Sequence, residues 1–302
     1  MRHLSRSPGG ASCILLAACM WGTTATARTF APAGAGPVAV GAARVIGGGL
    51  LLLVVALRGG ALRGLVARGT RTRCLLAIGA APVFTGILSA VTGGPGRPGA
   101  RWLAATAAAV AGCALLVTGG HASGASAEGV GLALLASFCY AVYAVTASYL
   151  ITNGASDRAV VGAIFGGAAV LLLPVVFISP MSWVATGPGL AVAAYLAVLT
   201  TALAYLLYAR GLRTTAVTTA TTLGLAEPAV AAVLGLAVLG EHLTPTGLAG
   251  LGVLAISLVI AAWPSSRSTT AATSDREPHQ HPGSATPSGA TSEPASRWAS
   301  RP

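Results

Sequence analysis

Long apolar stretches separated by short polar turns dominate this chain and predict helices that cross a membrane. The clearest example is the segment 223–262, in which the polar turn 240–245 joins two apolar runs. In chain order, the apolar runs lie at about 11–28, 38–57, 75–92, 102–118, 130–150, 159–178, 188–208, 215–239 and 246–263. The pattern predicts an all-α polytopic membrane protein with about nine apolar helices.

The apolar pattern repeats in two halves. A shift of 146 positions places the segment around Pro82 on the segment around Pro228 without a gap, and a shift of 119 positions places Trp21 on Tyr140. The two offsets differ by 27 residues, which is close to the length of one membrane helix with a turn. We therefore expect two helical repeats, the first of which is short by one helix.

The repeat and the composition together predict the domain organisation. Residues 1–10 are expected to form a cytoplasmic N-terminus, 11–118 the first repeat, 119–129 a polar linker, 130–263 the second repeat and 264–302 a disordered cytoplasmic tail. The run 11–28 also fits a signal peptide, because Ala25-Thr26-Ala27 is an acceptable cleavage site. Its internal counterpart at 130–150 favours a retained helix.

The composition agrees with a membrane protein. Of the 302 residues, 54% are hydrophobic and 8% are charged, whereas about a quarter of the residues in soluble domains are charged. The net charge of +11 comes from arginines that lie mainly between apolar segments. This distribution indicates membrane topology rather than a nucleic-acid-binding surface, so we expect no nucleic-acid partner. The five cysteines form no close pairs and are interpreted as buried hydrophobes.

Arginine-rich loops mark the cytoplasmic side of a membrane protein. Residues 58–73 and 97–101 both carry arginines, yet only the apolar run 75–92 separates them. A single crossing by this run would place one of the two loops outside. Because the run is short and contains Gly79, Pro82 and Gly86, we expect it to be re-entrant, strongly tilted or poorly inserted.

One acidic residue stands inside an apolar run. Glu227 precedes Pro228, and a carboxylate at membrane depth is costly unless it is paired, hydrated or protonated. Pro228 has no backbone N–H, so it leaves the carbonyl of Gly224 without its helical partner and predicts a helix break beside Glu227. The functional hypothesis is a site for a proton or a substrate amine. The structural alternative is that Glu227 bonds to the broken backbone or to Arg44.

Seven further residues are candidates for the same binding site. Arg44, about two turns inside its helix, would bind a substrate carboxylate or balance Glu227, although its long side chain can also reach the interface. Trp21 and Tyr140 are candidates to line a pocket; the alternative for the tyrosines is an interfacial aromatic belt. Three more tyrosines belong to this set: Tyr143, Tyr205 and Tyr208. Thr222 ends a hydroxyl stripe that indicates interhelical packing or, alternatively, the wall of a polar cavity.

Several of these residues also carry a family resemblance: Trp21-Gly22, the run Ala43–Gly47 around Arg44, and above all the segment 223–260 with its Glu227-Pro228 and Gly240-Glu241 pairs. Over residues 11–263 the chain resembles the EamA type of the drug/metabolite transporter superfamily. The resemblance implies ten helices in two inverted repeats, both termini in the cytoplasm, and export or import of small metabolites by alternating access. Two departures fall in the first half, where the third helix is absent and Gly94-Pro95 replaces a Gly-Glu pair.

We therefore expect a secondary transporter of small metabolites or drugs in the cell membrane, working as an efflux system by alternating access, with proton coupling as an option. Its expected partners are a small-molecule solute and the lipid bilayer. The alternatives are a non-transporting remnant of such a transporter and a homodimer that supplies the missing wall. The sequence has no phosphate-binding loop and no metal-spaced histidine pair inside an apolar run. We thus expect no catalysis, no metal and no cofactor.

Overall fold

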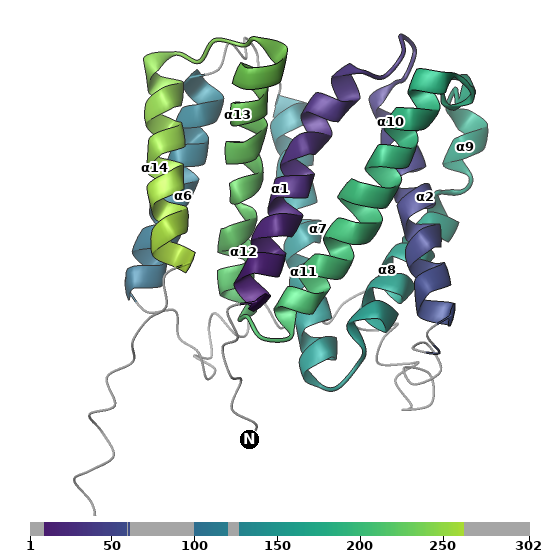
Figure 1. The fold of residues 1–302 in the computed structure, drawn as a ribbon, viewed down its shortest axis with the longest axis horizontal. Helices are drawn as coiled ribbons and strands as arrows, with labels where there is room; N and C mark the ends of the chain where they lie inside the picture. Colours follow the sequence, from purple (N-terminus) through teal and green to yellow (C-terminus); the bar gives the residue numbers. More distant parts are fainter. Residues whose placement is uncertain (1–8, 59, 61–99, 120–126, 263–302) are drawn as a thin grey trace, which may run out of the picture. The chain divides into compact units, whose positions relative to one another are not determined.

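The computed structural model describes residues 9–58, 60, 100–119 and 127–262, and every regular element in these ranges is a helix (Figure 1). Six helical segments of the described chain are long and apolar enough to cross a membrane: Gly9–Thr29, Pro37–Arg58, Asp157–Ile178, Gly187–Leu212, Val217–Leu239 and Pro245–Ala262. Two shorter apolar helices, Ala104–Leu116 and Phe138–Thr152, accompany them. The prediction of an all-α polytopic membrane protein is confirmed.

Three described helices belong to the first predicted repeat. They are α1 (Gly9–Thr29), α2 (Pro37–Arg58) and α6 (Ala100–Gly119), and their ends differ from the predicted ones by no more than 2 residues. The predictions for the run 75–92, for Pro82 and for the tail 264–302 fall outside the described residues.

The second predicted repeat contains five helical spans, of which the first and last are continuous: α7 (Ala127–Thr152) and α14 (Pro245–Ala262). In the next span α8 (Asp157–Leu172) ends before Pro174, which has no N–H for the helical ladder, and the short α9 (Val175–Ile178) follows. After the turn η1 (Ser182–Ala185), the third span begins as α10 (Gly187–Ala197), passes through a π-helical stretch, η2 (Val198–Leu203), and ends as α11 (Ala204–Leu212).

The remaining span is broken where the sequence predicts a break. α12 (Val217–Gly224) and α13 (Ala226–Leu239) are separated at Leu225. Glu227 and Pro228 then lie in the first turn of α13. A missing N–H is tolerated there, because the first N–H groups of a helix have no partner within it. Pro228 thus lies in the first turn of a new helix rather than in the middle of a continuous one.

Helices that the sequence repeat relates to each other pack together. α2 lies against α8, its counterpart at a shift of 119, and α6 lies against α14, its counterpart at a shift of 146. Glycines allow these close approaches, since a Cβ placed on Gly49 would lie 2.9 Å from the Cβ of Ala169 and one on Gly112 would lie 2.8 Å from the backbone N of Leu254. Contact between equivalent helices is expected where a pseudo-two-fold axis passes between them. The packing therefore supports the two-repeat organisation.

The ends of the helices alternate between two sides of the bundle (Figure 1). α1, α6, α8 and α12 begin on one side, and α2, α7, α11 and α14 end on that same side. Arg58 at the end of α2 and Ala100 at the start of α6 thus lie on one side.

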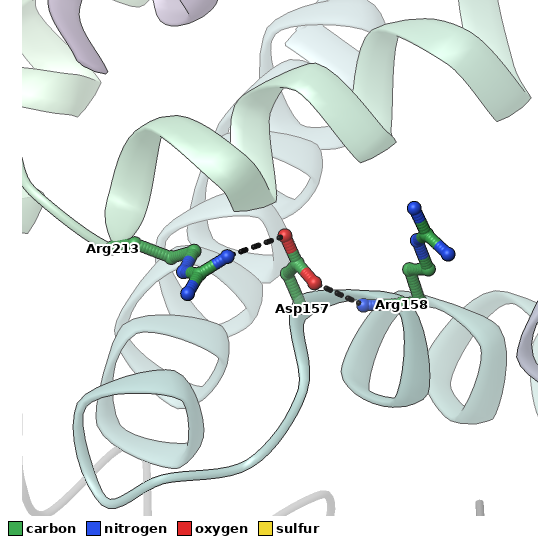
Figure 2. Close-up of polar contacts among 3 residues, drawn as sticks. All are labelled: Asp157, Arg158 and Arg213. Carbon is green, nitrogen blue, oxygen red and sulfur yellow. Dashed lines mark hydrogen bonds and ion pairs between the residues drawn. The ribbon is translucent and has the colours of Figure 1, made fainter. Parts of the chain in front are cut away.

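Most of the described arginines lie at helix ends on this side: Arg58, Arg101, Arg158, Arg210 and Arg213. Arg28 ends α1 on the other side. Figure 2 shows Oδ2 of Asp157 facing Nη1 of Arg213 at 3.8 Å, while Oδ1 of Asp157 accepts a hydrogen bond from the backbone N–H of Arg158 at 3.0 Å. The ion pair links the start of α8 to the end of α11. Because Arg213 is exposed, the pair contributes less than about 1 kcal/mol.

Candidate functional site

Aromatic side chains from four helices meet between the α1 and α7 segments that the repeat relates. We call this group the ring cluster; its members are Trp21 of α1, Tyr140 and Tyr143 of α7, Phe165 of α8, and Tyr205 and Tyr208 of α11. The ring centroid of Trp21 lies 4.9 Å from that of Tyr205 and 6.0 Å from that of Tyr140. These tyrosines pack on other rings inside the bundle, which is not the arrangement of an interfacial belt.

The ring cluster contains buried polar atoms that lack partners. The indole N–H of Trp21 and the hydroxyls of Tyr140, Tyr143 and Tyr208 make no well-aligned hydrogen bond in the described part of the chain. The hydroxyls of Tyr140 and Tyr208 are neighbours, but their geometry is poor. Each buried polar group without a partner costs about 1–3 kcal/mol. Access of water or of a polar solute to the cluster would remove this cost.

Arg44 of α2 is anchored to the π-helical stretch η2. Its Nε donates to Oγ1 of Thr201 at 3.0 Å, and its Nη2 donates to the carbonyl oxygen of Thr200 at 3.4 Å. Gly48, one turn further along α2, permits this approach, because a Cβ there would lie 2.8 Å from the carbonyl oxygen of Ala197. Both acceptors are uncharged. The guanidinium is therefore oriented by the protein without being neutralised by it.

Glu227 lies at the start of α13 and is backed by α1. A Cβ placed on Gly22 would lie 2.7 Å from the carbonyl oxygen of Glu227 and 2.7 Å from the Cβ of Val230, so only glycine permits this contact. The side chain of Glu227 is exposed. At the first turn of α13 its carboxylate interacts favourably with the positive end of the helix dipole.

The structure brings together five of the residues singled out from the sequence. Glu227 interacts electrostatically with Arg44, and Tyr205 lies in the field of both groups. Trp21 packs on Tyr205, and the hydroxyl of Tyr140 lies beside the broken turn between α12 and α13. Among the described residues, Arg44 and Glu227 form no direct ion pair within 4.0 Å, unlike Asp157 and Arg213. The site is therefore a separated pair of opposite charges next to the ring cluster.

Thr222 has different neighbours. Its hydroxyl lies 3.0 Å from Oγ1 of Thr106 in α6 and donates to the carbonyl oxygen of Thr218 at 3.0 Å. These contacts join α12 to α6 and are of the kind expected for packing between membrane helices. Of the two predicted helix-breaking prolines, Pro228 lies at the observed break, and Pro82 lies outside the described residues.

Two cavities open elsewhere on the described chain. One, of about 370 Å³, lies between α1, α10 and α13 and is lined by Thr23, Thr26, Ala27, Phe30, Ala191, Val192, Tyr195 and Leu234. The other, of about 360 Å³, is lined by residues 32–34 and by Pro180, Ser182, Trp183 and Thr186. Neither is lined by Arg44, Glu227 or a member of the ring cluster.

Comparison with known proteins identifies the family. Residues 127–263 match the model of the EamA-like transporter family. Over 290 residues the chain is 33% identical to "Uncharacterized transporter YwfM" of Bacillus subtilis (strain 168), a match that covers 86% of this chain and 96% of the relative. The chain belongs to the EamA-like transporter family. A solved structure titled "Crystal structure of protein" matches with a TM-score of 0.61 at 20% identity, covering 85% of this chain and 98% of its own, and shows the shared fold alone.

Membership of the EamA-like family confirms the resemblance found in the sequence and makes the chain a multi-pass membrane transporter of the drug/metabolite type. The alignment with the Bacillus relative spans 290 positions. This is more than the number of residues in the 86% of this 302-residue chain that it covers, so some positions of the relative have no counterpart here.

Sequence reasoning missed three contributors to the site. Thr200 and Thr201 hold Arg44, and Phe165 packs on Tyr205 with their ring centroids 4.1 Å apart. Two adjacent threonines inside the apolar run 188–208 were a weak signal for a partner of Arg44. The π-helical stretch itself has no sequence signature, because it depends on what packs against the helix.

Proposed function

We propose that this EamA-like protein is a secondary transporter that moves small metabolites or drugs out of the cell by alternating access, with Arg44 and Glu227 at its binding site. The observation that carries the proposal is the separated charge pair. Two opposite charges at membrane depth, held from α2 and α13 beside the ring cluster, are costly for stability and are typical of substrate or proton pathways. The printed name of the Bacillus relative, a transporter, supports the same assignment.

In the proposed cycle, Glu227 exchanges a proton for the cationic part of the solute. An occluded site within the membrane would penalise a lone carboxylate, so a proton or a cation must accompany it in that state. Arg44 moderates this penalty through its positive charge. The ring cluster closes one side of the pathway, and its partnerless polar atoms acquire partners when that side opens to water.

For the orientation, we propose that the arginine-rich side faces the cytoplasm of the cell membrane, as the positive-inside rule favours. The tail after α14 then begins on the cytoplasmic side. Single cysteines placed at Gly240 and at Gly154 test this arrangement by their accessibility to a membrane-impermeant thiol reagent in intact cells. Labelling of the Gly154 site rather than the Gly240 site would reverse the orientation and the proposed direction of transport.

A flux experiment tests the transport proposal. The full chain is reconstituted in proteoliposomes, a pH gradient is imposed, and a panel of labelled solutes is screened for gradient-driven flux. Glu227→Gln should reduce that flux to the level of empty liposomes, whereas the matched control Asp157→Asn, which removes a carboxylate outside the site, should retain it. Unchanged flux in Glu227→Gln would exclude a coupling role for this carboxyl.

The shortage of one helix that the repeat offsets predict supports a second candidate, a membrane protein that no longer transports. A wild-type chain that is monodisperse and unfolds cooperatively, yet moves no solute of the panel, would favour this reading. Crosslinking in the membrane separates a third candidate, in which a homodimer completes the wall and only the dimer is active.

A further inference from the structure

Two adjacent threonines of η2 hold Arg44, but they do so with different atoms. The side-chain oxygen of Thr201 accepts a hydrogen bond from Nε of Arg44 at 3.0 Å, whereas Thr200 offers its backbone carbonyl oxygen to Nη2 at 3.4 Å. The hydroxyl of Thr200 donates to the carbonyl oxygen of Leu196 at 2.9 Å, and the hydroxyl of Thr201 donates to the same oxygen at the same distance. The two threonines thus share one structural bond, and the side-chain bond to Arg44 belongs to Thr201.

The hydroxyl of Thr201 is held in one orientation. The residue is 1% exposed, and the hydroxyl hydrogen is committed to Leu196. A Cβ placed on Gly48 of α2 would lie 2.5 Å from the Cβ of Thr201, so α2 packs directly on this side chain. A hydroxyl has one hydrogen and two lone pairs. With its hydrogen in use, Thr201 is fixed as an acceptor for the Nε–H of Arg44.

The π-helical geometry of η2 supplies the second acceptor. The N–H of Ala204 bonds to the carbonyl oxygens of Leu199 and Thr201. In an α-helix this N–H would bond to the carbonyl of Thr200 instead. The carbonyl of Thr200 has lost that donor and accepts from Nη2 of Arg44. Single π turns inside α-helices are frequent at functional sites, and this one presents two acceptors to one guanidinium.

The two bonds determine where the charge of Arg44 lies. Arg44 is about two turns inside α2, and an arginine that is not held can extend its long side chain toward the membrane surface. Nε and Nη2 belong to one rigid, planar group, so bonds to both fix its plane as well as its place. In that place Arg44 interacts electrostatically with Glu227.

We propose that Thr201 is a positioning residue for the transport site: its hydroxyl keeps the guanidinium of Arg44 beside Glu227 and away from the membrane surface. Thr201 acts through Arg44 and need not touch the solute. The inference rests on the transport function proposed above and adds to it a residue whose effect differs from that of its neighbour Thr200.

The first test measures how firmly Arg44 is held, and it needs no solute. Phenylglyoxal, which reacts with guanidinium groups, is applied to the purified full chain in micelles. The rate of modification at Arg44, which is partly exposed, is measured by mass spectrometry of its peptide. Arg213, whose side chain is 58% exposed, serves as the reference in the same sample.

Thr201→Val removes the hydroxyl and should raise the rate at Arg44, relative to Arg213, by about 10-fold, because a hydrogen bond from a charged group is lost. Thr201→Ser retains the hydroxyl and should restore the slow rate. The matched variant is Thr200→Val, which loses the same bond to Leu196 but keeps the carbonyl that Arg44 uses. Equal rates in Thr200→Val and Thr201→Val would overturn the proposal, since a general loosening of η2 affects both.

The second test asks whether this position matters for transport. For a labelled solute that the wild type moves in the pH-gradient screen, Thr201→Val should raise the half-saturating concentration by about 10-fold with a smaller change in maximal rate. Thr201→Ser should restore the wild-type value, and Thr200→Val should raise it less than Thr201→Val does. A fall in maximal rate alone, equal in both valine variants, would indicate a structural role and overturn the proposal.

The two tests separate this proposal from the transport function. Faster modification of Arg44 in Thr201→Val with an unchanged half-saturating concentration would overturn the positioning role and leave transport intact. A wild-type chain that moves no solute of the panel would refute the transport function, while the modification rates would still decide whether the hydroxyl of Thr201 holds Arg44.

Discussion

The contact between Gly22 and the first turn of α13 is open to a direct test. Substituting alanine for Gly22 would introduce a Cβ 2.7 Å from the carbonyl oxygen of Glu227 and 2.7 Å from the Cβ of Val230. Both distances are far below van der Waals contact, and one of the two atoms belongs to the backbone. Either α1 or α13 must therefore move, and the carboxyl of Glu227 would move with α13.

The magnitude follows from two opposing contributions. Alanine is favoured over glycine in a helix by about 1 kcal/mol, while a methyl group forced into a packed interface costs about 1–3 kcal/mol. The matched control is Gly252→Ala on α14, where a Cβ would meet nothing within 4 Å, so that only the helix-propensity gain applies. Gly22→Ala should therefore be less stable than Gly252→Ala by about 1–3 kcal/mol.

The assay is equilibrium unfolding of the two variants and the wild type in the same mixed micelles, followed by solute flux in liposomes. Gly22→Ala should unfold at lower denaturant than both other chains and should transport more slowly, because the Arg44–Glu227 geometry has changed. Equal stability of the two alanine variants would refute the described packing of α1 on α13. Reduced stability with normal flux would instead show that the packing of α1 on α13 is not needed for the geometry of the binding site.

Three further predictions concern individual polar groups. Tyr208→Phe removes a buried hydroxyl without a well-aligned partner and should leave the unfolding free energy unchanged or raise it by up to about 1 kcal/mol; a loss of stability would reveal a partner for this hydroxyl. Thr222→Val should lower the unfolding free energy by about 1 kcal/mol through the lost bond to Thr106 with normal flux, and loss of flux at normal stability would return Thr222 to the binding site. Asp157→Asn should lower it by less than about 1 kcal/mol, and the difference from wild type should shrink in high salt; a salt-independent loss would contradict a surface ion pair with Arg213.

The sequence by itself indicated where the described helices of the first half begin and end, and it predicted a break beside Glu227. Crossing a bilayer requires a long apolar run, and this requirement is local, so the ends of α1, α2 and α6 follow from hydropathy with small errors. The break before α13 is local as well, because it depends on the missing N–H of Pro228. The repeat offsets even indicated which helices are equivalents, although not that α2 and α8 lie in contact.

The neighbours of each side chain depended on the tertiary structure. In a lipid-facing chain almost every helix face is apolar, so the pattern does not reveal which face meets which helix. Trp21 and Tyr140 were related by the repeat, but their meeting with Tyr205 requires the packing of α11 against α1. For Thr222 the sequence favoured a helix interface over a cavity wall, but only the packing of α6 shows that Thr106 is its neighbour.

The charge pair illustrates both contributions. A carboxylate and a guanidinium within apolar runs are conspicuous in the sequence, because the bilayer penalises each of them. Whether Glu227 and Arg44 pair, and what restrains them, was decided by elements far apart in the chain: a π-helical stretch that takes two hydrogen bonds from Arg44, and a glycine in α1 that fixes the start of α13. Local chemistry determined which residues are costly in a membrane, and only the packing of distant helices determined that these two charges remain apart.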